Sequence, residues 1–246
     1  AATSTRKILK FINVSNPAVP VFKWDLNPTD VTWVHAIHIR GTKLITSGWG
    51  GKIEIYDIAN LATQAPVFVS AISGNNNNHS TWTSEDGNYL YSCRELLDGD
   101  LRVYDIRDSA TPLLVKSIKA ADLGLNAITP HNPVVMGNLL YVSWYQAGLQ
   151  VFDITNPANP VRIGQYDTFQ PAFAPTDQQL TELSDSPWDM ICGGENLQNS
   201  LPSNYDGNWA VFPFLGQSKV LAGDLKNGLL IREQDSPAAK ECRLGF

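Results

Sequence analysis

The prediction of the fold starts from one stretch of sequence, Gly148-Leu149-Gln150-Val151-Phe152-Asp153-Ile154-Thr155-Asn156-Pro157-Ala158-Asn159-Pro160. Side chains on a strand alternate between two faces, and its first residues place Leu149 and Val151 on one face. The two Asn-Pro pairs then end the strand, because proline fixes φ and has no N–H for a β-ladder. The stretch therefore predicts a short strand with a sharp exit.

Three further copies of this pattern precede it in the chain. They are Gly99–Ile106 closed by Pro112, Gly51–Ile58 closed by Pro66, and Phe11–Pro20. The equivalent Asn or Asp residues lie 44 residues apart from 13 to 57, and 48 apart from 57 to 105 and from 105 to 153. A period in the forties that is built from strands and turns predicts a β-propeller.

We therefore predict an all-β propeller with about four strands in each blade, as a single domain over 1–246. Four innermost strands and an N-terminal half-blade give five blades by direct count, unless the chain is a fragment of a larger propeller. Residues of about 167–206 depart from the period and predict a long inserted loop. Residues 234–246 are expected to form a flexible tail.

Composition excludes several classes of protein. The chain has 43% hydrophobic and 17% charged residues and a formal charge of −6, which predicts a globular protein without nucleic-acid partners. No apolar run is long enough to span a bilayer. Because the chain begins at Ala1 without a leader segment, we expect a removed targeting peptide or a longer parent chain.

Two further short features leave alternatives open. The three cysteines, Cys93, Cys192 and Cys242, allow one disulfide, such as Cys192 with Cys242, and one free thiol. The sequons at Asn13 and Asn78 matter only in a secreted eukaryotic protein.

Three segments carry a resemblance to a known family. They are His79–Gly87, His131–Pro133 with Tyr145–Leu149, and Asp206–Trp209 with Phe212–Phe214. The chain resembles bacterial propellers with the LVIVD repeat, and is most similar to the choice-of-anchor B family of surface and secreted proteins, whose members are generally longer. The resemblance implies a propeller that is secreted, periplasmic or at the cell surface, and implies no reaction. A looser resemblance to copper-associated, methanethiol-oxidising propellers rests on the repeat alone.

Histidine offers the first candidate site. His35 and His131 each precede a turn glycine by six residues, and His79 and Asn208 each precede one by eight. Because the first strand of a blade lines the propeller channel, we expect these four residues at one channel mouth. The three imidazoles would there bind Zn²⁺ or Cu²⁺. The alternative is that the channel is too wide and each His caps its own blade.

Two other repeated positions also allow either a ligand-binding or a structural role. Asp57, Asp105 and Asp153 suit either a Ca²⁺ site or an Asx turn that accepts backbone N–H bonds, and Asn13 at the same place favours the turn. Trp49 and Trp144 both stand just before the repeat strand. They form either an aromatic platform for carbohydrate or peptide, or packing between blades.

Motifs of nucleophilic hydrolases, zinc peptidases and nucleotide-binding enzymes are absent from the sequence. The sequence therefore predicts no catalytic residue. It favours an extracytoplasmic binding or scaffolding protein that acts at a cell surface or within an assembly, with a protein or surface-glycan partner. The alternative is a copper- or zinc-dependent oxidase or hydrolase that uses the ring of histidines.

Overall fold

The computed structural model describes residues 8–29, 31–74, 77–96, 98–125, 127, 129–168, 205–216 and 219–233. Most of the predicted loop at about 167–206 and all of the predicted tail at 234–246 lie outside these residues, as do Cys192 and Cys242. The third cysteine, Cys93, is a buried free thiol.

The described residues form seventeen strands in five antiparallel sheets, and within each sheet every strand pairs with its neighbour in the sequence. The N-terminal hairpin contains β1 (Leu9–Asn13) and β2 (Val21–Leu26). Blade 1 contains β3 (Trp33–Arg40), β4 (Lys43–Trp49), β5 (Ile53–Asp57) and β6 (Val67–Ile72). Blade 2 contains β7 (Asn78–Thr83), β8 (Tyr89–Arg94), β9 (Asp100–Asp105) and β10 (Leu113–Lys119).

The second half of the chain continues this plan. Blade 3 contains β11 (Asn132–Met136), β12 (Leu139–Ser143), β13 (Leu149–Asp153) and β14 (Val161–Tyr166). Blade 4 contains β15 (Asn208–Phe212), β16 (Lys219–Asp224) and β17 (Gly228–Glu233). A short 3-10 helix, η2 (Ala121–Leu123), lies between blades 2 and 3. The all-β propeller architecture predicted from the repeat is confirmed, and the expected N-terminal half-blade is the two-stranded hairpin.

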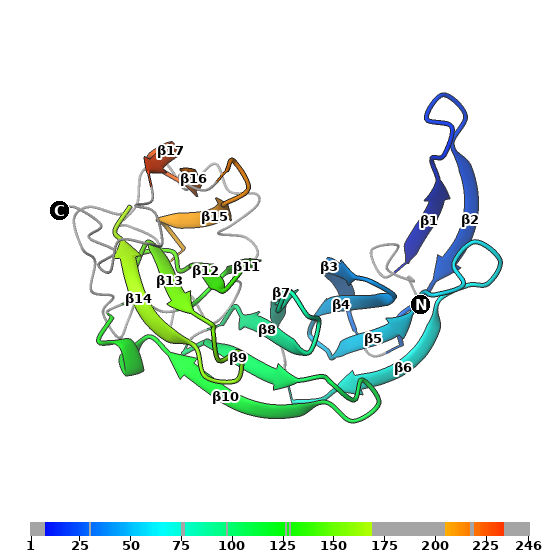
Figure 1. Cartoon of the computed structure of the whole chain (residues 1–246), viewed down its shortest axis with the longest axis horizontal. Coiled ribbons are helices and arrows are strands. Elements are labelled where there is room, and N and C mark those ends of the chain that lie inside the picture. Colours follow the sequence, from blue (N-terminus) through cyan, green and yellow to red (C-terminus); the bar gives the residue numbers. More distant parts are fainter. Residues whose placement is uncertain are drawn as a thin grey trace.

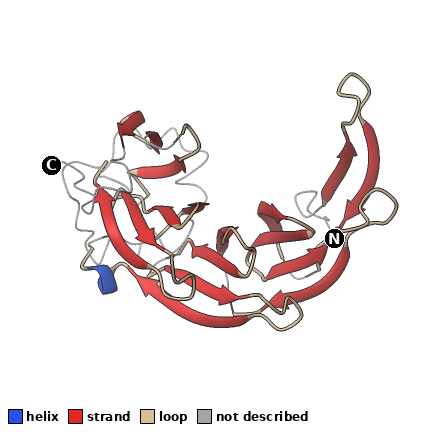
Figure 2. Ribbon diagram, in the orientation of Figure 1, coloured by secondary structure: helices blue, strands red, loops and turns tan. Residues whose placement is uncertain are grey.

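The sheets follow one another along an arc, as Figure 1 shows. The first strands β3, β7, β11 and β15 lie toward the inside of the arc, while β6 and β10 run along its outside. Nearly all of the regular structure is strand (Figure 2). Because strands alternate in direction, the start of each inner strand and the end of its neighbour meet at the same edge of the blade.

The repeat strand ends as its sequence predicts. The side-chain oxygen of Asn13 accepts the backbone N–H of the residue two positions on at 2.9 Å, and Asp57, Asp105 and Asp153 do the same at 2.8, 3.0 and 2.7 Å. These are Asx turns, in which the side chain replaces a backbone acceptor. The turn interpretation is therefore confirmed.

The outer strands share a second local feature, a β-bulge. In each of β2, β6, β10 and β14 the pairing with the preceding strand skips one residue; the skipped residues are Lys23, Val69, Val115 and Ile163. A bulge increases the local twist of a strand. The hairpin and blades 1 to 3 therefore each end in an outer strand that is bent at the same place.

Apolar side chains fill the spaces between neighbouring blades. Between blades 1 and 2, Ile45 and Ile55 pack with Leu90. A larger cluster between blades 2 and 3 contains Trp144. Between blades 3 and 4, Leu149 and Val151 of β13 pack with Val211 and Val220 of blade 4. Stacking of sheets face to face thus provides the core.

Candidate functional site

A row of aromatic side chains occupies one position in all four blades, at the start of the inner strand. His35, His79 and Trp209 each fill a bulge, where the pairing of β3, β7 and β15 with the next strand skips one residue. His131 directly precedes β11, and its backbone N–H donates to the backbone carbonyl of Ser143. The bulge turns these side chains toward the neighbouring blade, because it breaks the regular alternation of the strand.

Each histidine in this row bonds to the next blade. The Nδ1 atoms of His35, His79 and His131 lie 2.9, 3.2 and 2.6 Å from the carbonyl oxygens of His79, His131 and Trp209, respectively. Because a carbonyl oxygen only accepts, each Nδ1 carries the proton, and each neutral ring keeps a lone pair on Nε2. The ring centroids of His35 and His79 are 3.9 Å apart, and those of His79 and His131 are 3.8 Å apart.

The indole of Trp209 agrees with this assignment of the protons. Its Nε1–H donates to Nε2 of His131 over 2.7 Å, which requires a lone pair on that nitrogen. The backbone of the same residue is also held, since the Ser80 hydroxyl donates to the carbonyl oxygen of His131 over 2.7 Å. The His131 ring is therefore held by bonds on both nitrogens.

Glu95, directly after β8, brings a carboxylate to the histidines. One oxygen lies 3.7 Å from Nε2 of His79, and the other lies 3.9 Å from Nε2 of His131. The hydroxyl of Tyr145 donates to the second oxygen. His79, Glu95 and His131 are 5%, 1% and 1% exposed, so their polar atoms face one another away from bulk water.

Glu95 and Tyr145 occupy equivalent positions, and Trp49 is their counterpart in blade 1. Each lies six residues after the second-strand residue that pairs with the repeat Asp. Tyr145 has a φ of +39°, in the left-handed region that side chains other than glycine rarely adopt. Two backbone bonds with Asn208, of 2.8 and 3.0 Å, hold it there. A strained residue held in this way is typical of a functional site.

The pKa values follow from burial. Burial lowers the pKa of His79 well below 6.5, and the neighbouring His131 and His35 lower it further. Burial also lowers the pKa of His131 to about 3, against the opposing effect of its bond to the Trp209 carbonyl. For Glu95, burial raises the pKa to about 7, although the bond from Tyr145 opposes this. Near neutral pH the histidines are uncharged, and Glu95 is close to half-ionised.

The structure brings together most of the residues that the sequence singled out. The rings of His35 and His79 and those of His79 and His131 are in contact, so neighbouring blades are close enough for these side chains to meet. Asn208 lies next to them, but the fourth member of the row is Trp209, because the bulge shifts the equivalence by one residue. Asn208 is buried, and its side-chain amide donates to Gly223 over 3.3 Å.

The predicted aromatic platform is wrong for Trp144. This side chain is 0% exposed in the core between blades 2 and 3, so it offers no surface to a ligand. Trp49 is half-buried beside Trp33, with ring centroids 5.8 Å apart, and faces His35 at 6.1 Å. Trp49 thus extends the aromatic row, whereas Trp144 packs the blades.

Two histidines of the row, together with Glu95, have the chemistry of a metal site. The ligand atoms of His79, Glu95 and His131 all lie within 4.8 Å of one another. His35 was predicted with them, but it does not belong to this group of ligand atoms. Glu95 was missed, because the blades place Trp49, Glu95 and Tyr145 at its position and no residue type repeats. Burial of a carboxylate is a property of the fold alone.

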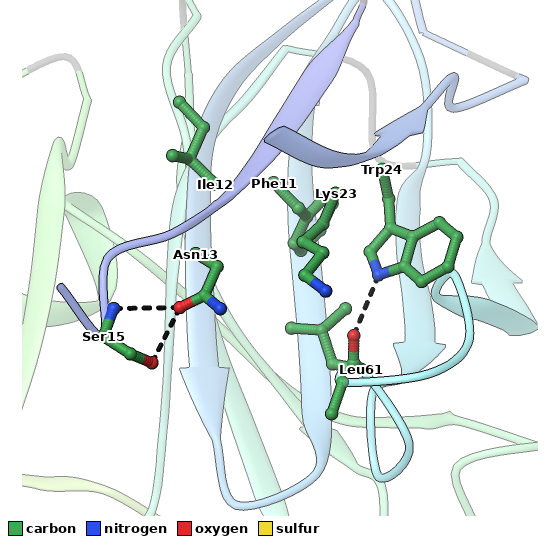
Figure 3. A pocket seen from close by; sticks show the side chains of 8 residues that line it. Phe11, Ile12, Asn13, Ser15, Lys23, Trp24 and Leu61 are labelled. Atoms are coloured by element: carbon green, nitrogen blue, oxygen red, sulfur yellow. Dashed lines mark hydrogen bonds between the residues drawn. The ribbon is translucent and has the colours of Figure 1, made fainter. Parts of the chain in front are cut away.

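A separate pocket lies at the other end of the arc, between the N-terminal hairpin and the loop after β5. Figure 3 shows Phe11, Ile12 and Trp24 around it, with Lys23 reaching in from β2. Its volume is about 290 Å³. The indole N–H of Trp24 donates to the carbonyl of Leu61 over 2.8 Å and attaches the hairpin to blade 1.

Comparison with known sequences supports the repeat. The LVIVD repeat matches residues 132–168, which cover blade 3. A comparison with curated proteins finds no match. Within the residues that the structure describes, no helix has the length and apolar character needed to cross a membrane.

Solved structures support the propeller. A protein from Lactobacillus plantarum is 12% identical, with a TM-score of 0.68 over 96% of this chain and 63% of its own. A protein from Bacteroides uniformis, named as a candidate 6-phosphogluconolactonase, is 14% identical, with a TM-score of 0.54 over 65% of this chain and 48% of its own. This chain thus spans less than two thirds of either structure, and at these identities the likeness concerns the fold.

Proposed function

We propose that this chain is a binding and scaffolding propeller that acts outside the cytoplasm, within an assembly formed by stacking of sheet faces. One observation carries the proposal. Leu149 and Val151 on β13 are 4% and 5% exposed, whereas Leu229 and Ile231 on β17 are 64% and 61% exposed. Large exposed apolar patches mark interaction surfaces.

The two pairs of residues are structurally equivalent. Leu149 follows Gly148, which has a φ of +70°, and Leu229 follows Gly228, which has a φ of +74°. Leu149 pairs across the sheet with Ser143, and Leu229 pairs with Gly223, the corresponding residue of β16. In blade 3 the apolar pair is covered by blade 4. The outward face of blade 4 therefore has the chemistry of a face that packs against another sheet.

The first blade offers a complementary face. Ile37 and Ile39 on β3 are 53% and 50% exposed. Val135, the blade 3 counterpart of Ile39, is 1% exposed and packs toward blade 2. A second copy of this chain therefore presents the kind of face that the blade 4 face fits, in a head-to-tail contact. Such contacts join different surfaces and build rings or filaments.

The proposed assembly is tested by sedimentation velocity between roughly 1 and 100 μM, a range in which weak protein contacts are populated. The wild-type protein is expected to self-associate, and the double variant Leu229→Ser, Ile231→Ser to remain monomeric. Leu113→Ser is the matched control, because Leu113 is 63% exposed but lies on an outer strand. Monomeric wild-type protein at the highest concentration, or an equal effect of Leu113→Ser, would refute the assembly.

The extracytoplasmic location rests on the resemblance to surface and secreted propellers. Fractionation of the source cells, with protease added to intact cells, tests it. The protein is expected to be digested, to be found in the medium or to be released with the periplasmic fraction. Protection until the cytoplasm is released would contradict this part of the proposal. A glycan partner is not included, since burial of Trp144 removes half of the predicted platform.

A further inference from the structure

We propose that His79, Glu95 and His131 bind one divalent transition-metal ion, with Zn²⁺ as the reference ion, and that the ion displaces the indole of Trp209 from His131. This site is independent of the proposed assembly, because it lies at the start of β7 and β11 rather than on the outward face of blade 4. The copper- or zinc-dependent enzyme that the sequence left as an alternative would need a metal site of this kind.

The donor atoms decide the class of ion. Two imidazole nitrogens and one carboxylate oxygen are the ligands of many zinc sites that keep a further position open for water or substrate. Calcium and magnesium prefer sets of oxygen atoms. The combination at this site therefore favours zinc, copper or a neighbouring first-row ion over calcium.

The histidines are already oriented as metal ligands. Metal-binding histidines usually donate their second ring N–H to a carbonyl or carboxylate, which fixes the ring and its tautomer. The Nδ1 atoms of His79 and His131 make such bonds, to the carbonyls of His131 and Trp209. Both Nε2 lone pairs are thereby directed to the side on which the Glu95 carboxylate lies.

The three ligand atoms lie within 4.8 Å of one another, so they must move closer together to hold one ion. A tetrahedral zinc ion with bonds of about 2.0–2.1 Å holds its ligand atoms roughly 3.4 Å apart. The Glu95 oxygens lie 3.7 and 3.9 Å from Nε2 of His79 and His131. Those contacts are longer than hydrogen bonds, so closing them costs no existing bond between these groups. The hydroxyl of Tyr145 holds the carboxylate in place.

Trp209 is the residue that must move. Its indole N–H bonds to the same Nε2 lone pair of His131 that an ion requires. The side chain is 41% exposed, in contrast to the three buried ligands, so it is the solvent-facing member of the cluster. Binding of an ion therefore exchanges this hydrogen bond for a metal bond, and changes the environment of the indole.

The first experiment measures Zn²⁺ binding to untagged protein that has been treated with chelator, by isothermal titration calorimetry. Wild-type protein is expected to bind one ion per chain. Glu95→Gln and His79→Gln are expected to weaken binding at least 100-fold, since each removes one of three ligands. Glu95→Gln keeps the shape of the side chain and an acceptor for Tyr145, so melting curves without metal should match those of the wild type.

The control is His38→Gln. His38 is buried, and its Nε2 interacts with the Thr83 hydroxyl over 2.9 Å in the contact between blades 1 and 2. It lies outside the group of ligand atoms. Its replacement is expected to leave zinc affinity within threefold of the wild-type value, so that loss of binding in the other variants reports the ligands rather than the fold.

The second experiment uses tryptophan fluorescence. Zn²⁺ is expected to change the emission of the wild-type protein reversibly on chelation, and Trp209→Phe is expected to lose this change. Without the competing hydrogen bond, Trp209→Phe should bind zinc about two- to tenfold more tightly. Absence of stoichiometric binding by the wild type, or unchanged affinity in Glu95→Gln, overturns the proposal. Weaker binding by Trp209→Phe overturns the displacement of the indole.

Discussion

Blades 3 and 4 are built to the same plan, yet only blade 3 has both of its faces covered. Leu149 and Val151 are almost fully buried, while Leu229 and Ile231 at the same positions are more than half exposed. The alternation of apolar and polar residues along a strand thus indicates which face of the sheet is apolar. Whether that face is buried depends on the presence of a neighbouring sheet. The local sequence therefore specifies the direction of these side chains, and the packing of sheets determines their burial.

The largest expected effect compares the two leucines directly. Leu149→Ala should lower the free energy of unfolding by about 2–4 kcal/mol, because it leaves a cavity between blades 3 and 4. Leu229→Ala should change it by less than about 0.5 kcal/mol, since an exposed side chain leaves no cavity. Urea denaturation at a concentration where the protein is monomeric measures both. Equal losses would mean that the outward face of blade 4 is covered.

A second comparison concerns two glycines with positive φ, Gly207 just before blade 4 and Gly216 in the turn between β15 and β16. Gly207 has a φ of +107°, and a Cβ there would lie 2.2 Å from the carbonyl oxygen of Tyr145. Gly216 has a φ of +92° with no atom within 4 Å of such a Cβ. Gly216→Ala should cost about 1–2 kcal/mol for the left-handed backbone alone.

Gly207→Ala should cost more than Gly216→Ala by at least about 1 kcal/mol, because the clash adds to the backbone strain. It should also displace Tyr145 and therefore weaken Zn²⁺ binding, an effect that Gly216→Ala lacks. Thermal melting and zinc titration of both variants measure this. If the two alanines were equivalent in both measurements, the close approach of Gly207 to Tyr145 would be unimportant.

A further expected effect is a pH dependence in the contact between blades 1 and 2. Burial and the nearby charge of Arg40 lower the pKa of His38 to about 4. Its Nε2 also accepts the backbone N–H of Thr83 over 3.3 Å, which requires the neutral ring. The Trp82 ring covers it at 4.6 Å, and Arg40 pairs with Glu85 at 3.0 Å.

The sign follows from the lowered pKa of a base. Between about pH 6.5 and 4 the unfolded chain binds a proton at His38 that the folded protein does not, so stability falls as the pH falls. The loss approaches about 1.4 kcal/mol per pH unit and ends below the folded-state pKa. The slope for His38→Gln, measured by urea denaturation from pH 7 to 4, should be smaller by this amount. An unchanged slope would show that His38 is already protonated in the folded protein.

Much of the fold could be predicted, because the repeat encodes it locally. The spacing of Asn13, Asp57, Asp105 and Asp153 located the blades, and their chemistry predicted the Asx turns. Bulges are not visible in an alternating pattern, however. One inserted residue moved the equivalence from Asn208 to Trp209.

The candidate site could be predicted only in part. The spacing of the histidines predicted that they share one mouth of the channel. The platform failed because Trp144 is buried between blades 2 and 3. The residue of blade 3 at the position of Trp49 is Tyr145, which is also buried. Glu95 had no repeated signal, since its role depends on the distance between two blades. Distances across an interface come from packing, which a single strand does not encode.

The bulges of the outer strands have a consequence for solubility. These strands begin with exposed apolar residues, such as Val67, Phe68 and Leu113, a composition that favours growth of amyloid-like fibrils from an open edge. A fibril needs a straight edge on which strands of other molecules can add in register. The residue skipped in each outer strand bends that edge, so one molecule cannot act as a template for the strands of the next.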